Sequence, residues 1–98
     1  MPIEQKLAIL DAGTFVDVSD MKVVAMKKLL ADLSLKFSEP KDTIAEYTSK
    51  AQGVLQKDGI KENCQDIMEE MDKAEADKVQ NTPYSSAIIL YLMLREKQ

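Results

Sequence analysis

The side chains that most often carry out chemistry in proteins are few in this sequence of 98 residues. It contains no histidine, so it lacks the usual general base and the most frequent metal ligand. Its single cysteine, Cys64, leaves no thiol pair for a zinc site or an internal disulfide. The three glycines are isolated from one another and form no phosphate-binding loop. We therefore expect no catalytic residue, no metal site and no cofactor, and we do not expect an enzyme.

Cys64 could act as a nucleophile, but its neighbours favour a structural role. It lies at helical spacing from Ile60, Ile67, Met68 and Met71, which together form an apolar face. An apolar environment raises the pKa of a thiol and makes it inert. We interpret Cys64 as a residue of the hydrophobic core.

Six carboxylates lie between residues 66 and 77. Carboxylate-based metal sites in helical bundles also need histidines, and an EF-hand loop needs a glycine between the acids; neither is present here. One interpretation is a solvated helix face with supporting pairs such as Glu69 with Lys73. The other is an acidic docking face for a basic partner, with Asp66, Glu69, Glu70 and Asp77 as candidates.

Apolar spacing and turn residues place these side chains on helices. They predict five helices, over residues 2–11, 19–37, 39–58, 61–80 and from 83 nearly to the end. Ser19 and Thr82 are the expected N-caps of the second and last helices, and Gly59 is the expected left-handed residue of a Schellman ending. Because the loops are short, we expect successive helices to pack roughly antiparallel. The expected fold is all-α, a compact bundle of five helices in one domain over residues 1–98.

Charge and hydropathy restrict the partners. The net charge is −4, so nothing draws the chain to nucleic acid or to an anionic membrane. The longest apolar run, Ala87–Leu94, is much shorter than the stretch of about 18 residues that spans a bilayer. The first ten residues lack the apolar core of a signal peptide, and a lone cysteine fits a reducing compartment. We expect a cytoplasmic protein.

The Ala87–Leu94 run is apolar on every side of its helix, which leaves two interpretations open. This helix is either the buried centre of the bundle, or an edge helix with one face covered by a second subunit. Its terminal position in the chain suits an edge helix. The interface candidates lie at helical spacing along one face: Tyr84, Ile88, Leu92 and Arg95.

The order of elements resembles the PTS regulation domain, or PRD, a helical module of bacterial antiterminators and activators. Three stretches carry the resemblance: residues 10–17 ahead of the long second helix, residues 46–60 through the glycine-containing turn, and the closing run Ile88–Leu94. The resemblance implies a function in transcription regulation. PRD modules accept phosphoryl groups on histidines of the third and last helices, and the matching neighbourhoods here contain Lys50 and Leu92. It therefore implies a relative that keeps the fold without the phosphorylation and without an attached nucleic-acid-binding domain.

The hypothesis that follows is a non-enzymatic regulatory or protein-interaction domain that binds a protein partner and forms a homodimer. The alternative is a small acidic inhibitor or immunity-type protein whose fourth helix blocks a basic site on its target. The two differ in their response to salt. Apolar self-association survives high salt, whereas charge-driven binding by a monomer weakens steeply.

Overall fold

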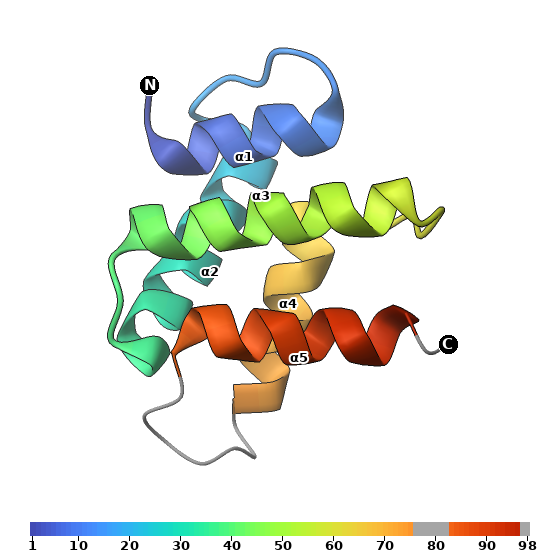
Figure 1. Cartoon of the computed structure of the whole chain (residues 1–98). Coiled ribbons are helices and arrows are strands. Elements are labelled where there is room, and N and C mark those ends of the chain that lie inside the picture. The colour runs from blue at the N-terminus through green and yellow to red at the C-terminus, as the bar shows by residue number, and fades with distance from the viewer. Residues whose placement is uncertain (76–82, 97–98) are drawn as a thin grey trace.

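The computed structural model describes residues 1–75 and 83–96 of the chain. These residues form five α-helices and no strand, which confirms the all-α prediction (Figure 1). No helix among them is long and apolar enough to cross a membrane. The helices are α1 (Ile3–Ala12), α2 (Met21–Phe37), α3 (Lys41–Lys57), α4 (Cys64–Glu75) and α5 (Tyr84–Glu96).

The helices form two layers. In Figure 1, α1, α3 and α5 lie side by side and run in the same direction, while α2 and α4 cross behind them. α3 is the middle helix and contacts the other four, and α5 lies at the edge, packed on α3 and α4. The expectation that successive helices pack antiparallel is therefore wrong. Left-handed residues at Gly13, Ser38 and Gly59 turn the chain sharply after the first three helices, so that each following helix starts in the other layer.

The observed helix ends agree with the predicted caps except at two positions, the N-cap of α2 and the start of α4. The Schellman ending is confirmed: Gly59 has a φ of +79°, its N–H donates to the carbonyl of Gln56, and the N–H of Ile60 donates to that of Leu55 at 2.9 Å. The N-cap of α2 is Asp20 and not Ser19, because the Asp20 carboxylate accepts from the N–H of Lys22 at 2.9 Å. The expected cap Thr82 lies outside the described residues.

The second correction concerns α4, which begins at Cys64, three residues later than expected. Asn63, just before the helix, and Asp66, in its first turn, form a capping box. The Asn63 side chain accepts from the N–H of Asp66 at 2.8 Å, and the Asp66 carboxylate accepts from the N–H of Asn63 at 3.3 Å. This pair fixes where the helix starts.

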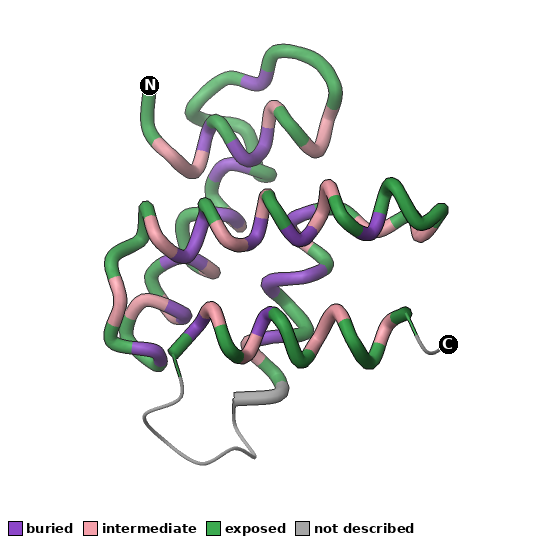
Figure 2. The backbone as a smooth tube through the Cα atoms, viewed as in Figure 1, coloured by how far each residue is buried: buried purple, intermediate pink, exposed green. Residues whose placement is uncertain are grey.

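The core lies between the two layers, where the buried segments of the helices face one another (Figure 2). The apolar side chains at helical spacing along α2 are buried: Val23, Met26, Leu30, Leu33 and Phe37. Cys64 is fully buried, as predicted. The largest fully buried side chains come from four helices: Met26, Leu30 and Leu33 of α2, Ile44, Thr48 and Leu55 of α3, Cys64, Ile67 and Met68 of α4, and Tyr84 of α5.

Candidate interaction surface

The inner face of α5 is held by side chains of α2 and α3. The hydroxyl of Tyr84 lies 2.7 Å from that of Thr48, and its ring meets the ring of Phe37 edge-on with centroids 5.0 Å apart. The carboxylate of Glu39 accepts from the N–H of Tyr84 at 2.9 Å and so caps the first turn. Burial raises the pKa of the Tyr84 hydroxyl above its usual range. These contacts orient the whole helix.

This orientation corrects the face chosen from the sequence. Tyr84 and Ile88 are only 0% and 3% exposed, and Leu92 and Arg95 are half-buried. These four residues follow one side of α5, as their spacing predicts, but that side faces the core of the same chain. The first two are therefore covered within one copy of the protein.

An ionic cluster holds the second half of α5 against the segment before α4. Glu62 accepts a hydrogen bond from the hydroxyl of Tyr91, and its other carboxylate oxygen lies 2.7 Å from the guanidinium of Arg95. The Glu62 side chain is only 12% exposed. Burial, together with the bond to Glu62, raises the pKa of Tyr91, and the same carboxylate raises the pKa of Arg95. Both ends of α5 are thus fixed.

The opposite side of α5 is apolar and exposed. We call Ile89, Leu90, Met93 and Leu94 the outer face of α5; between 47% and 58% of each residue is accessible to solvent. Every residue from Ala87 to Leu94 is apolar or aromatic and uncharged, so the sequence pattern could not distinguish this side from the inner one. Contiguous apolar patches on a monomer often mark sites of protein contact.

α2 carries a second exposed apolar stripe on the side opposite its core residues. Met21, Val24 and Leu35 are 86%, 59% and 82% exposed, and with Ala31 they follow a spacing of three and four residues. Lys28 occupies the middle of this outer stripe of α2.

The acidic candidates on α4 are largely engaged within the chain. Asp66 takes part in the capping box, and Glu70 lies 3.6 Å from Lys73, which replaces the expected pair of Glu69 with Lys73. Glu69 is exposed and accepts from the side chain of Gln65 at 3.3 Å. The neighbouring Asp72 forms a 2.5 Å ion pair with Lys36 of α2. Asp77 lies outside the described residues.

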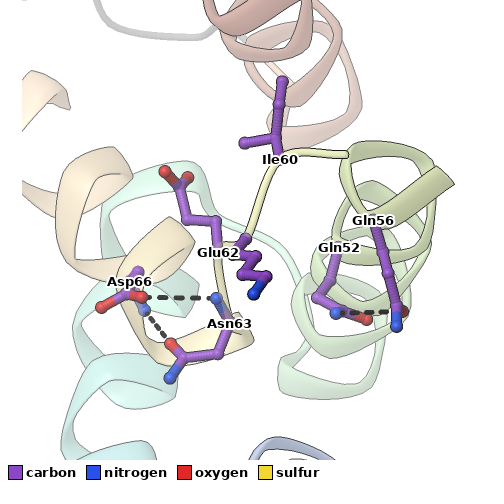
Figure 3. Close-up of a pocket in the computed structure, with 7 residues that line it drawn as sticks. Gln52, Gln56, Ile60, Glu62, Asn63 and Asp66 are labelled. Atoms are coloured by element: carbon purple, nitrogen blue, oxygen red, sulfur yellow. Dashed lines mark hydrogen bonds between the residues drawn. The ribbon is translucent and has the colours of Figure 1, made fainter. Parts of the chain in front are cut away.

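A shallow groove of about 420 Å³ lies between the end of α3 and the start of α4 (Figure 3). Gln52 and Gln56 line one side and share a hydrogen bond, while Asn63 and Asp66 line the other with their capping bonds. Because these polar groups bond to one another, we assign the groove to the capping of α4. Among the described residues, no group of three histidine, cysteine, aspartate or glutamate side chains is placed to hold a metal ion.

Cys64 lies at the start of α4, next to a carboxylate from α1. Asp11 accepts hydrogen bonds from the backbone N–H groups of Cys64 and Gln65 at 2.8 and 2.9 Å. Burial, and then the negative charge of Asp11, raise the pKa of the Cys64 thiol to about 12. This environment disfavours the nucleophilic thiolate and agrees with the core interpretation.

The two positions singled out by the PRD resemblance have different environments. Lys50 is exposed on α3, with its ammonium 3.1 Å from the carboxylate of Glu46 and 5.8 Å from the ring centre of Tyr47. Leu92 is half-buried on α5. Comparison of the chain with family models, with curated proteins and with solved structures finds no match.

Proposed function

We propose that this chain is a non-enzymatic regulatory domain that works by binding protein through the outer face of α5. The observation that carries this proposal is the group of four exposed apolar side chains, Ile89, Leu90, Met93 and Leu94, on one side of a helix whose other side is fixed to the core. Fully burying such a side chain contributes about 1.5–3 kcal/mol, so covering the exposed half of four contributes roughly 4 kcal/mol per copy. A rigid helix presents this surface without ordering a loop.

The non-enzymatic part of the proposal rests on the side chains that could do chemistry. The sequence has no histidine, and its one thiol is buried with a raised pKa. The charged and hydroxyl groups near α5 are engaged in holding the helix: Glu62 with Tyr91 and Arg95, and Glu39 with the N–H of Tyr84. These interactions support a structural use of the groups.

The regulatory part of the proposal rests on the resemblance to the PRD. Lys50 and Leu92 stand in the neighbourhoods where that family has histidines, and neither side chain accepts a phosphoryl group from a phosphohistidine donor. Regulation by this chain would therefore proceed through contacts with another protein. The free thiol of Cys64 suits a reducing, cytoplasmic setting.

The alternative function, an acidic inhibitor that uses the fourth helix, has weaker support. Asp66 and Glu70 are engaged within the chain, by a capping box and an ion pair. Of the acidic candidates that lie in the described residues, Glu69 is the one whose carboxylate meets only a neighbouring glutamine. A single exposed carboxylate gives little electrostatic complementarity to a basic site.

Photo-cross-linking in the cell that naturally makes the protein tests the proposed function. A photoreactive phenylalanine at Leu94, on the outer face of α5, should give covalent adducts with protein. The matched control is the same residue at Leu35, which is apolar and 82% exposed on α2. Adducts from position 94 alone support the proposal. Absence of adducts from position 94, or equal adducts from both positions, contradicts it.

A further inference from the structure

The outer stripe of α2 has two opposite charges between its exposed apolar residues. Met21 and Leu35, toward the two ends of the stripe, are 86% and 82% exposed, the highest values among the large apolar side chains of the described residues. Lys28 and Asp32 lie between them, one turn apart on the same side of the helix. This surface therefore combines apolar contact area with a fixed order of charges.

Neither of these two charges has an ionic partner in the part of the chain that the structure describes. Lys28 and Asp32 form no ion pair with each other or with another described side chain, whereas Lys36 of the same helix pairs with Asp72 of α4. Asp32 is half-buried, and charges that are partly removed from water are screened less by salt. A partner that fits this surface supplies an anion to Lys28 and a cation to Asp32.

A second copy of the chain supplies both charges in the required order. When two α2 helices pack antiparallel across a two-fold axis level with Leu30, residues equally far from the axis on either side meet. Lys28 lies two positions before Leu30 and Asp32 two positions after it, so each Lys28 meets the Asp32 of the other copy. A parallel pair would instead set Lys28 beside Lys28 and Asp32 beside Asp32, which is unfavourable. The charges therefore favour the antiparallel arrangement.

The other residues of the stripe fit the same arrangement. Val24 lies six positions before Leu30 and Leu35 lies five positions after it, so Leu35 of one copy packs against Val24 of the other. Ala31 lies one position from the axis, where a small side chain lets the two helices approach closely. Lys27 lies at the edge of the stripe. Its two copies are about 9 Å apart along the helices, a separation at which salt screens most of their repulsion.

The position of α2 leaves this stripe open to a second copy. α2 lies in the layer behind α1, α3 and α5, and its buried residues face the core between the two layers (Figure 1). The outer stripe is on the opposite side of the helix, and its apolar residues Met21, Val24 and Leu35 are exposed. It is a surface separate from the outer face of α5, which belongs to the other layer.

We propose that the outer stripe of α2 binds a second copy of this chain, with the two α2 helices antiparallel, each Lys28 paired with Asp32 of the other copy, and Ala31 beside the two-fold axis. This inference goes beyond the proposed function, because it assigns self-association to a different helix. In such a dimer the outer face of α5 stays available to another protein.

Sedimentation equilibrium with charge reversals tests the ionic pairing. The wild-type chain should be a dimer of the 11.0 kDa subunit. Lys28→Glu and Asp32→Lys, made as separate proteins, should each weaken self-association at least about tenfold, because each brings like charges together at the contact. The mixture of the two variants should form a mixed dimer, in which opposite charges meet again.

The matched control for the charge reversals is Lys50→Glu on α3. It also creates a pair of like charges one turn apart within a helix, because Lys50 is paired with Glu46, but it lies outside the proposed contact. This variant should dimerise as wild type does. A wild-type monomer, charge-reversal variants that still dimerise, or a mixture that fails to associate overturns the proposal.

Variants of the apolar residues distinguish the surfaces of α2 and α5. Leu35→Glu should weaken the dimer and leave the circular dichroism spectrum unchanged, because Leu35 is exposed. Met93→Glu, on the outer face of α5, should remain dimeric. If Met93→Glu splits the dimer and Leu35→Glu does not, self-association uses α5 and the proposal is wrong.

Cross-linking tests the direction of the helices. Ala31→Cys, treated with a short bismaleimide, should give cross-linked dimer, because this position lies beside the axis. Val24→Cys should give none with itself, since its two copies are about 18 Å apart along antiparallel helices. Wild type is the control, because Cys64 is buried. Equal amounts of dimer from both variants indicate a parallel pair and contradict the proposed geometry.

Photo-cross-linking separates this dimer from the proposed function. A photoreactive residue at Leu35 should give an adduct with the mass of two copies, whereas the adducts that test the proposed function join the chain to a different protein. A dimer without such adducts at position 94 supports self-association through α2 and contradicts the proposed function. A monomer with adducts at position 94 has the reverse meaning.

Discussion

The hydroxyl groups of Thr48 and Tyr84 lie 2.7 Å apart in the interior and join the middle of α3 to the start of α5. The Thr48 hydroxyl donates its hydrogen bond to the carbonyl of Ile44 at 2.8 Å. Its oxygen therefore accepts a hydrogen bond from the hydroxyl of Tyr84. The ring of Tyr84 packs edge-on against Phe37, with an interplanar angle of 84°. This single side chain therefore sets which side of α5 faces the core and which side faces solvent.

Removing the Tyr84 hydroxyl should lower stability by the value of one buried hydrogen bond. We expect Tyr84→Phe to reduce the free energy of unfolding by about 1 kcal/mol in urea denaturation. Tyr84→Leu should cost roughly 3 kcal/mol, because it also removes the aromatic contact and leaves a cavity. The control is Tyr47→Phe, since Tyr47 is half-buried and its hydroxyl makes no hydrogen bond to the described residues. Equal costs for the two Phe variants would show that the Thr48 contact contributes nothing.

Asp11 should stabilise α4 from a distance of more than fifty positions along the chain. We expect Asp11→Ala to reduce the free energy of unfolding by about 1–2 kcal/mol, because two backbone N–H groups at the start of α4 lose their acceptor. Asp11→Asn should recover part of this loss, since an amide oxygen still accepts a hydrogen bond. Glu46→Ala is the control, because its ion pair with Lys50 is exposed and worth little. If Asp11→Ala costs no more than Glu46→Ala, the cap is not made in solution.

The raised pKa of Cys64 predicts a loss of stability in alkali. The thiol has an ordinary pKa of 9.0 and a folded-state pKa of about 12. Below pH 9 the thiol is protonated in both states. Above pH 9 the unfolded thiol ionises and the folded one does not, so stability falls as pH rises from 9 towards 12. Between pH 8 and pH 10, wild type should lose roughly 1 kcal/mol more than Cys64→Ala, measured by urea denaturation.

A thiol reagent provides an independent check on the same residue. Cys64 should react slowly in native buffer and quickly in urea, because it is fully buried in the folded chain. Rapid labelling of the native protein, or identical pH dependence in wild type and Cys64→Ala, would contradict the buried environment.

The fold class and helix count could be predicted from the sequence because their signals are local. Gly13 and Gly59 end helices by adopting left-handed conformations, and apolar spacing marks the buried stripe of α2. The crossing of successive helices could not be predicted, because loop length alone does not fix direction. The start of α4 depends partly on Asp11, which no local pattern connects with Cys64.

The candidate surface was harder to predict because its determinants are tertiary. Ala87–Leu94 is apolar throughout, and the side facing the core is decided by Thr48 and Phe37 on other helices. A weak local signal was available in Ser86, which shares a side with Leu90 and Met93 at helical spacing and is exposed. The residues of the outer stripe of α2 also follow a spacing of three and four residues. The buried side of the same helix gives a stronger apolar pattern, so this second spacing was not recognised as a separate surface.

The caps of α4 and α5 also set an order in which the chain can become structured. The N–H groups of Cys64 and Gln65 bond to Asp11, and that of Tyr84 bonds to Glu39, so both acceptors precede their donors in the chain. During synthesis the acceptors leave the ribosome first. They are therefore already outside the ribosome when α4 and α5 emerge. In the first turns of α1 and α2, the N–H groups of Gln5 and Lys22 bond to Pro2 and Asp20, which also precede them in the chain. When the chain folds from the N-terminus towards the C-terminus, the Asp11 and Glu39 caps of α4 and α5 are therefore available as these helices form.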